Sequence, residues 1–493
     1  MREKVLVIFI ITCLFFQQDR VKAFVPQKRV REKVTSRRLE VAQRPSPGES
    51  EIQKVFGVLW KAAQYTISDP LRFRYAAATA TRFGFFLTQG IGISLLGIDS
   101  TARQNSNSIN AQSVIGALTD AVLANDEETT KTIIDEIEIE KSVAAKAVLD
   151  DDEQRALFNK NFQAIVKVLR SDLANIESGA YKFPYDLQFL GEGDNSNVLN
   201  RRQWNPAAVL AQTATYIQDR QNVFDRRDRK DGTEIRKKFQ SSKYPEYYLQ
   251  NFHYQTDGWL SARSAQLYDY QVESLFIGTA DAMRRQVLPF FTRWVKDTRK
   301  QGIEPKVLDV ATGTGRFASF LMDNFRSLSL DVLDLSPFYL AEARKILNKY
   351  DTVRYVEAAA ESTGLPDASY DAITCVYLFH ELPSDIRKAV LCEWMRILKP
   401  GGKIFFVDSA QEGEVPYDRV LEGFTVVAHE PYYLDYTKNE IGSVFQQAGF
   451  EVEQREVHWV SKLLVATKPA CDRSSEDATE SMETSVPSKE EYP

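Results

Sequence analysis

The chain has 493 residues, with 62 lysines and arginines against 68 aspartates and glutamates, and a formal net charge of -6. This length exceeds that of one ordinary domain, so two or three structured regions are expected. Hydrophobic residues make up 43% and charged residues 26%, which is typical of globular proteins. The acidic balance argues against a nucleic-acid partner, because nucleic-acid binding normally requires a basic face.

The first 48 residues have the pattern of a targeting leader. Arg2 and Lys4 precede an apolar run over residues 5–16, and Ala23 marks a plausible cleavage site, as in a secretory signal. The run is too short to span a bilayer, which takes about 20 residues. The segment that begins at Phe24 is basic. Together, the signal-like segment and this basic segment resemble the bipartite leaders of algae with secondary red plastids. This resemblance implies import into a plastid, to the stroma or the thylakoid surface; plain secretion is the alternative.

Four cysteines and four histidines are scattered along the chain. Cys13 lies in the leader, and the three that remain form neither a disulfide framework nor a zinc-binding spacing. A reducing compartment fits such cysteines. No two histidines are spaced to share one helix face, so no metal site is expected.

Residues 49–243 show helical periodicity and no strand pattern, which predicts an all-helical domain of unknown role. One expected helix spans 126–149, with isoleucines between acids. Breaks are expected near Pro70, at 191–200 and at 231–232, where turn-forming residues cluster. The clearest helical face consists of Phe158, Phe162, Ile165, Leu169 and Ile176.

An apolar stretch over residues 83–98 contains four glycines, Gly84, Gly90, Gly92 and Gly97. Each glycine costs about 1 kcal/mol relative to alanine in a helix, so a continuous helix is doubtful here. The stretch is either a buried helix pair with a loop or a peripheral membrane contact.

The second half alternates between strands and helices after a helical, aromatic-rich lead-in over 244–300. This alternation predicts a parallel, doubly wound α/β sheet over 301–469, followed by a disordered tail over 470–493. The last two strands are too close in sequence for a crossover and must form an antiparallel hairpin. The expected strands cover residues 306–310, 330–333, 353–358, 372–376, 403–408, 451–458 and 462–467.

The first of these strands runs into a glycine turn that opens a helix. Gly313 and Gly315 allow the backbone to approach a ligand, and Asp334, after the second strand, can accept both hydroxyls of a ribose. With Ala318, the same glycines also fit a dinucleotide pattern, so an NAD(P)-dependent oxidoreductase is an alternative. The acid Asp309 inside the first strand, the closing hairpin, and the helix stop over 398–402 favour S-adenosyl-L-methionine (SAM) instead.

These features resemble the class I SAM-dependent methyltransferases, within the branch of ubiquinone and menaquinone C-methyltransferases, over about residues 265–468. The resemblance implies a Rossmann-like, seven-stranded sheet with an antiparallel last hairpin. It also implies a cofactor site that, motif by motif, contains Asp309, Ala311, Thr312, Gly313 and Gly315 for the methionine part, Asp334 and Leu335 for the ribose, and Ala360 and Glu361 beside the adenine. Ala359 stands where the family often has an aspartate, which puts one adenine contact in doubt.

Several side chains are candidates for the acceptor side. His380 follows the fourth strand at the ligand-binding edge of the sheet and could act as a base, or could brace its loop. His429, Tyr432, Tyr433 and Tyr436 lie in an insertion that often shapes the acceptor pocket in this family, although core packing explains them equally well. The aromatics from Tyr247 to Tyr268 are a second candidate lid, and Tyr268-Asp269 resembles a Tyr-Asp of the quinone branch.

The function expected from this sequence is methyl transfer to a small, aromatic or lipid-soluble acceptor, such as a quinone precursor or a pigment intermediate. The acceptor follows from the resemblance and the compartment, not from any residue. A further alternative is a non-enzymatic assembly or regulatory protein that binds SAM, because nothing in the helical half points to catalysis.

Overall fold

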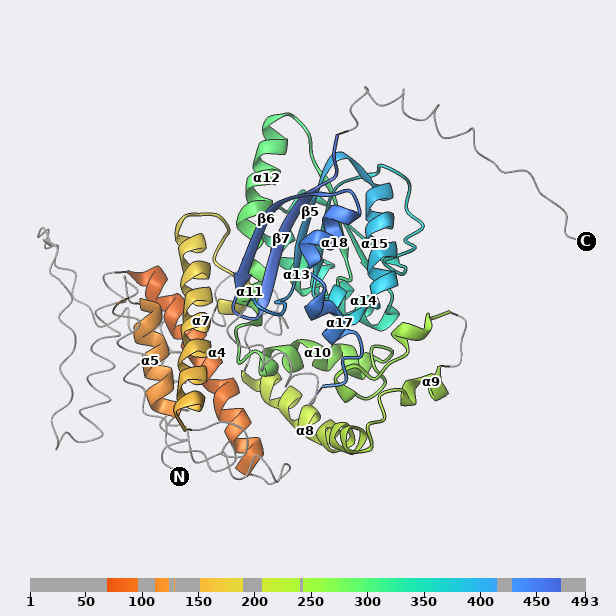
Figure 1. The fold of residues 1–493 in the computed structure, drawn as a ribbon. Helices are drawn as coiled ribbons and strands as arrows, with labels where there is room; N and C mark the ends of the chain where they lie inside the picture. The colour runs from red at the N-terminus through yellow and green to blue at the C-terminus, as the bar shows by residue number, and fades with distance from the viewer. Residues whose placement is uncertain are drawn as a thin grey trace, which may run out of the picture. The chain divides into compact units, whose positions relative to one another are not determined.

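The computed structural model describes residues 69–95, 111–123, 128, 151–188, 206–239, 243–414 and 428–470. The chain divides into two compact units (Figure 1). Unit 1 comprises Met1–Asp225 and Gln266–Gln286, and unit 2 comprises Arg226–Ala265 and Val287–Pro493. The predicted leader, the predicted turn at 191–200 and the predicted tail from 471 lie outside the described residues, as does the expected helix at 126–149 apart from Glu128.

Unit 1 is helical, as predicted for the N-terminal region. Its described helices are α4 (Pro70–Leu95), α5 (Ala111–Leu123), α7 (Asp151–Glu177), η3 (Tyr185–Leu187) and α11 (Ala280–Arg285). Helix α8 (Pro206–Arg229) ends in unit 2, and α10 (Ala262–Leu275) begins there. Helix α4 contacts both α5 and α7, and the three lie side by side in Figure 1. The predicted apolar face of α7 is confirmed at four of its five positions, because Phe162, Ile165, Leu169 and Ile176 are all buried; the side chain of Phe158 lies outside those described.

The expectation that glycines interrupt the 83–98 stretch is wrong as far as Leu95. Helix α4 continues through Gly84, Gly90 and Gly92 to that residue. Phe83 and Phe86 are buried, and the Phe83 ring packs edge-on against Phe162 of α7 with 6.3 Å between centroids. Such burial contributes about 2 kcal/mol per side chain and offsets the local cost of glycine. No helix in the described part of the chain is long and apolar enough to cross a membrane.

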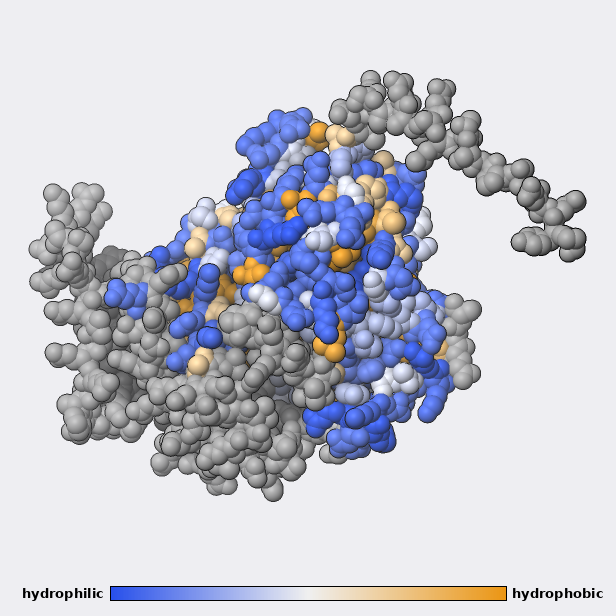
Figure 2. Space-filling model, viewed as in Figure 1, coloured by the Kyte–Doolittle hydropathy of each residue, from blue (hydrophilic) through white to orange (hydrophobic). Residues whose placement is uncertain are grey.

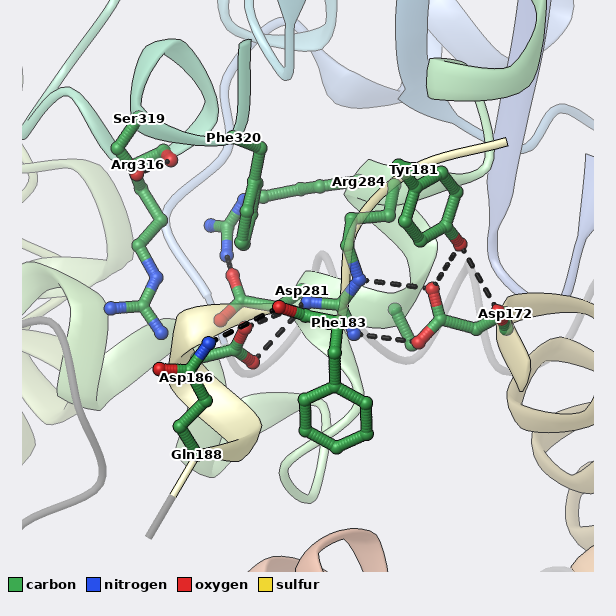
Figure 3. Close-up of polar contacts among 12 residues, drawn as sticks. Asp172, Tyr181, Phe183, Asp186, Gln188, Asp281, Arg284, Arg316, Ser319 and Phe320 are labelled. Atoms are coloured by element: carbon green, nitrogen blue, oxygen red, sulfur yellow. Dashed lines mark hydrogen bonds and ion pairs between the residues drawn. The ribbon is translucent and has the colours of Figure 1, made fainter. Parts of the chain in front are cut away.

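Buried ion pairs link the helices of unit 1 (Figure 3). The Arg285 guanidinium donates to Asp172 of α7 over 2.6 Å and to Asp186 of η3 over 3.0 Å. The hydroxyl groups of Tyr75 and Tyr181 also donate to the Asp172 carboxylate. The Arg285, Asp172 and Asp186 side chains are at most 2% exposed. Loss of Arg285 would leave the Asp172 carboxylate without a cation, whereas Asp186 would keep its pair with Arg82, at 2.7 Å.

Unit 2 contains a seven-stranded sheet with the order β3-β2-β1-β4-β5-β7-β6. Strands β1 to β5 are parallel, and β7 runs antiparallel to both β5 and β6, which confirms the predicted Rossmann-like class I methyltransferase sheet. Strand β5 begins at Leu398, earlier than predicted, because Leu398 pairs with Tyr370 ahead of a register shift. The strands are β1 (Lys306–Val310), β2 (Ser329–Asp334), β3 (Val353–Glu357), β4 (Tyr370–Val376), β5 (Leu398–Ser409), β6 (Glu451–His458) and β7 (Ser461–Thr467).

Helices cover both faces of this sheet. Successive side chains of a strand point to opposite faces, and Phe405 and Phe406 of β5 show this directly. Phe406 packs against Phe379 and Phe445, whereas Phe405 packs against Phe291 of α12. The helices of this unit are α9 (Glu234–Lys238), α12 (Leu288–Lys300), α13 (Arg316–Asn324), α14 (Pro337–Leu347), α15 (Ser384–Ile397), α17 (Tyr433–Lys438) and α18 (Ile441–Gln447), with the short turns η4 (Glu246–Tyr248), η5 (Phe252–Tyr254) and η6 (Phe379–Glu381).

Hydrophilic residues dominate the face of the described residues seen in Figure 2. Among residues whose exposure the structure describes, the large exposed hydrophobic side chains are Leu275, Ile303 and Leu434. Single exposed hydrophobic residues of this kind are normal on protein surfaces and indicate no binding patch.

Candidate cofactor site

The candidate cofactor site lies at the carboxyl ends of β1 and β2, where open α/β sheets bind ligands. After β1 the backbone turns sharply, with Ala311 at a φ of 53° and a hydrogen bond of 2.9 Å from the Thr312 amide to the Leu333 carbonyl at the end of β2. The turn then leads directly into α13. The predicted strand, glycine turn and helix are therefore present in the expected order.

The two glycines of this turn have different roles. Both have a positive φ, 57° at Gly313 and 78° at Gly315, which favours glycine. A Cβ on Gly315 would lie 3.1 Å from the Cβ of Ala343, so this glycine lets α13 pack against α14. A Cβ on Gly313 would meet nothing closer than Tyr339, at 4.0 Å, so the space beside Gly313 is open to a ligand.

Asp334 lies next to the Gly313 turn, as the predicted cofactor site requires. Its Oδ2 accepts a hydrogen bond of 2.8 Å from the Gly313 amide, and its Oδ1 accepts one of 2.8 Å from the Ser336 amide. These bonds fix the carboxylate at the end of β2 while leaving lone pairs for further donors. Burial raises the pKa of Asp334 to about 6, against the opposing effect of the backbone hydrogen bonds.

Asp309 lies inside β1 and is 2% exposed. Its Oδ1 accepts a hydrogen bond of 2.6 Å from the Thr374 hydroxyl of β4, whereas its Oδ2 has no hydrogen-bond partner. Burial raises the pKa of Asp309 to about 6, although the Thr374 hydroxyl acts in the opposite direction. A buried carboxylate oxygen without a donor is costly, so this atom fits a ligand that carries donors or positive charge.

The predicted adenine-side segment follows β3. Ala360 is buried, and Ala359 forms an isolated bridge with Ser362. Glu361 accepts a hydrogen bond of 2.7 Å at Oε1 from the Tyr247 hydroxyl, while its buried Oε2 has no hydrogen-bond partner. The lead-in thus reaches the same edge of the sheet as the glycine turn.

The lead-in covers the ribose side of the site through apolar contacts. Tyr248 packs together with Leu335, the predicted neighbour of the ribose acid, in one cluster. Ser336 donates to the Trp259 carbonyl over 2.6 Å, and the Trp259 ring stacks on Phe252 with 4.3 Å between centroids. Part of the predicted aromatic lid therefore packs against the residues that follow β2, beside the candidate cofactor site. Tyr268-Asp269 lies on α10 in unit 1, and its contact with a cofactor stays a prediction.

His380 lies on η6, directly after β4, and is paired with an acid that sequence reasoning missed. Its Nδ1 is 2.5 Å from Oδ1 of Asp408, which is fully buried and also accepts hydrogen bonds from the amides of Phe379 and Ser409. Burial lowers the pKa of His380, but the charge and hydrogen bond of Asp408 raise it more, so the pKa lies above its ordinary value. The only signal in the sequence is an acid at the end of an apolar strand.

The predicted acceptor-side residues of the insertion fall into two groups. Tyr433 and Tyr436 approach His380 edge-on, with ring centroids 5.9 and 6.3 Å away. The Nε2 of His429 is instead 3.1 Å from the side-chain oxygen of Gln250 in the lead-in. Tyr432 is half-buried, and residues 415–427 lie outside the described residues.

Two further acids near η6 were not singled out as ligands from the sequence. Glu381 and Glu430 are buried, and both lie close to the imidazole of His253. Burial and the neighbouring charge of Glu430 raise the pKa of Glu381 well above its ordinary value. These three residues are far apart in the sequence, so only the fold brings them together.

Comparison with known proteins relates the α/β domain to methyltransferases. Residues 307–402 match a family described as a methyltransferase domain. The demethylmenaquinone methyltransferase of Chlorobaculum tepidum is 33% identical over 153 residues, which cover 30% of this chain and 54% of that protein. The ubiquinone/menaquinone biosynthesis C-methyltransferase UbiE of Rickettsia massiliae is 31% identical over 147 residues, which cover 28% and 54%. The chain thus spans about half the length of the curated relatives it matches.

One similar solved structure is a SAM-dependent methyltransferase from Aquifex aeolicus, with 22% identity and a TM-score of 0.27, covering 35% of this chain and 88% of that one. The fold assignment itself depends on the strand order and on the reversed last strand. The family match names methyltransferases, which agrees with SAM and not with the nicotinamide alternative. The α/β part of this chain has the class I methyltransferase fold, matches a methyltransferase-domain family over residues 307–402 and resembles the ubiquinone and menaquinone C-methyltransferases, which supports S-adenosyl-L-methionine as its cofactor.

Proposed function

We propose that this protein transfers a methyl group from SAM to a small, aromatic and lipid-soluble acceptor, a quinone precursor or a pigment intermediate. The relatives named above support the quinone class. The observation that carries the proposal is His380, held by Asp408 and surrounded by tyrosine rings at the ligand-binding edge of the sheet. Aromatic rings of this kind suit a flat ring substrate.

Some residues of this chain would bind the cofactor, and others would bind the acceptor. SAM, when bound, supplies an electrophilic methyl group on a sulfonium centre. The Asp334 carboxylate, held by the Gly313 amide, would accept the ribose hydroxyls, and the open space at Gly313 would admit the ligand to the backbone. These contacts aim the acceptor and the methyl group at each other, which is the main source of rate in such a displacement.

His380 would receive the proton that the acceptor loses. A carboxylate only accepts hydrogen bonds, so the proton between Asp408 and His380 belongs to Nδ1, and Nε2 keeps a lone pair. Nε2 can then accept a proton from a hydroxyl group or from an activated ring carbon. The surrounding rings of Tyr377, Tyr433 and Tyr436 would help to exclude water.

The test is methyl transfer by the purified full chain from isotope-labelled SAM to a panel of demethylated hydroquinones and simple phenols, read by mass spectrometry. We expect a methylated hydroquinone, and we expect His380→Asn to lower turnover by about 10²- to 10⁴-fold. Binding of S-adenosylhomocysteine should change less than twofold in this variant, because His380 lies outside the cofactor residues. Binding without turnover on any acceptor would refute the enzyme and favour the regulatory alternative.

We also propose that the protein acts in a plastid, at the stroma or the thylakoid surface. The support is the tandem leader pattern over residues 1–48, with Phe24 at its junction. Residues 1–48 fused to a fluorescent reporter should accumulate in the plastid of an alga with a secondary red plastid. Secretion of the reporter would contradict this location. Phe24→Ala should reduce import into the plastid, because Phe24 is proposed to open the transit segment.

A further inference from the structure

A histidine and two buried glutamates converge in unit 2 from three distant parts of the chain. His253 belongs to η5 in the lead-in, Glu381 ends η6, and Glu430 precedes α17. One potential ligand atom from each residue lies within 4.8 Å of the others. His253 Nδ1 is 3.0 Å from Glu430 Oε1, and His253 Nε2 is 3.9 Å from Glu381 Oε1.

The two carboxylates are buried without adequate partners. The Glu430 side chain has no exposed surface and that of Glu381 is 6% exposed. Apart from the contact of Oε1 with His253, neither oxygen of Glu430 has a hydrogen-bond partner, and neither does Oε2 of Glu381. Buried charges are rare unless they are paired or bind metal, and two carboxylates beside one imidazole leave room for a further positive charge.

We propose that His253, Glu381 and Glu430 bind one divalent cation of the Mn²⁺ or Zn²⁺ class. When both carboxyl groups are deprotonated, as metal binding requires, they carry two negative charges that one divalent ion neutralises, and a neutral imidazole completes the ligand set. The imidazole nitrogen suits Zn²⁺, and the carboxylate oxygens suit Mn²⁺. The sequence predicted no metal site, because its histidines are not paired and the acids come from elsewhere in the chain.

Side-chain rotation would have to bring the ligand atoms together around an ion. Tetrahedral ligands at about 2.1 Å from a metal are separated from each other by about 3.4 Å, and one potential ligand atom from each of the three residues lies within 4.8 Å of the others. His253 is 32% exposed, which provides access from solvent. Three protein ligands leave a coordination position open, as in catalytic metal sites.

The cation would also connect the lead-in to the acceptor side of the domain. Glu381 Oε1 is 3.6 Å from Nε2 of His380, so the ion would lie close to the proposed acceptor. Its binding would link η5, η6 and the segment that precedes α17. The binding site itself does not depend on the identity of the acceptor or on methyl transfer.

The test uses the full chain, stripped with a chelator and titrated with Mn²⁺ alone or Zn²⁺ alone. We expect one ion per chain by calorimetry and elemental analysis, and a rise in melting temperature when the ion is added. Glu430→Gln and His253→Gln should each weaken binding by about 100-fold, since each removes a ligand. Glu451→Gln, at an exposed position on β6, serves as the control and should bind as the original chain does.

Glu430→Gln preserves the size of the side chain and removes a buried charge, so the metal-free variant should fold at least as well as the original chain. Its melting temperature should no longer respond to either ion. The proposal is overturned if neither ion is taken up stoichiometrically at millimolar concentration. It is equally overturned if the glutamine variants bind as tightly as the control, because the ion would then lie elsewhere.

Discussion

Replacement of Asp334 by asparagine tests the cofactor site most directly. In the structure, the two carboxylate oxygens accept one backbone amide each, from Gly313 and Ser336, which fixes the side chain at the end of β2. Asparagine keeps the shape but replaces one oxygen by an NH₂ group. That group cannot accept a hydrogen bond, so either a backbone amide or a ribose hydroxyl loses its acceptor.

The magnitude follows from the loss of charge. A hydrogen bond to a charged group contributes about 1.5–3 kcal/mol, against about 0.5–1.5 kcal/mol for a neutral one. For two ribose hydroxyls, we expect Asp334→Asn to cost about 2–3 kcal/mol, which raises the Kd for S-adenosylhomocysteine about 30- to 150-fold.

The assay is calorimetric titration of the full chain with S-adenosylhomocysteine at pH 7.5, with NADH as a ligand that should not bind. Asp297→Asn, on the exposed surface of α12, is the matched control. An affinity of Asp334→Asn within twofold of the original chain would refute the reasoning, since it would mean that this carboxylate does not contact the cofactor.

The pH dependence of binding provides a second measurement on the same residue. Burial raises the pKa of Asp334 to about 6, from about 3.9 in an unfolded chain. The folded protein therefore holds more protons than the unfolded chain between these values, so stability without ligand decreases as pH rises through this window. Cofactor binding has the opposite sign, because it uses the carboxylate. The affinity should increase from pH 5 to about 6.5 and then level off, and the increase should be smaller in Asp334→Asn.

Three further predictions concern other residues. Asp309→Asn removes a buried charge whose pKa is raised to about 6, so at pH 8 chemical denaturation should show a gain of up to about 3 kcal/mol while calorimetry shows weaker cofactor binding. Gly315→Ala should lower the free energy of unfolding by about 2–4 kcal/mol, because the new Cβ sits on a left-handed backbone and contacts Ala343. Gly313→Ala should lower it by only about 1–2 kcal/mol, but S-adenosylhomocysteine should no longer bind in calorimetric titrations, because the Cβ fills the space open to the ligand. Arg285→Met should lower the free energy of unfolding by about 3–5 kcal/mol, and Arg72→Met, which breaks a half-exposed pair, by less than about 1 kcal/mol.

The strands of the sheet could be predicted from the sequence because each strand is recognised from the pattern of its own consecutive residues. Strand β5 contains Ile404, Phe405, Phe406 and Val407 in succession, as expected for a strand covered on both faces. The glycine turn could be located for the same reason, since the strand, the bend and the helix start are consecutive. Asp334 lies 21 residues after Gly313, yet parallel pairing of β1 with β2 brings them together at one edge.

The remaining features depend on contacts between distant segments. Helix α4 continues through its glycines because burial of Phe83 and Phe86 outweighs a local preference. Asp408 supports His380 only because β4 and β5 are neighbours in the sheet. His253, Glu381 and Glu430 likewise have no common sequence motif, and no periodicity within a window of the chain would reveal them.

Buried carboxylate oxygens without partners indicate where unit 2 requires ligands. Among its described residues, such oxygens belong to Asp309, Glu361, Glu381 and Glu430. Native proteins satisfy nearly all buried polar atoms, so an orphaned carboxylate oxygen in a core would be a defect. Here these atoms occur in two groups, one at the predicted cofactor site and one at the proposed cation site. A cofactor with hydroxyl, amine and sulfonium groups supplies donors and positive charge to the first group, and a divalent cation supplies charge to the second. The same physical requirement therefore accounts for both sites, and each ligand should stabilise the fold by satisfying atoms that the chain alone leaves without partners.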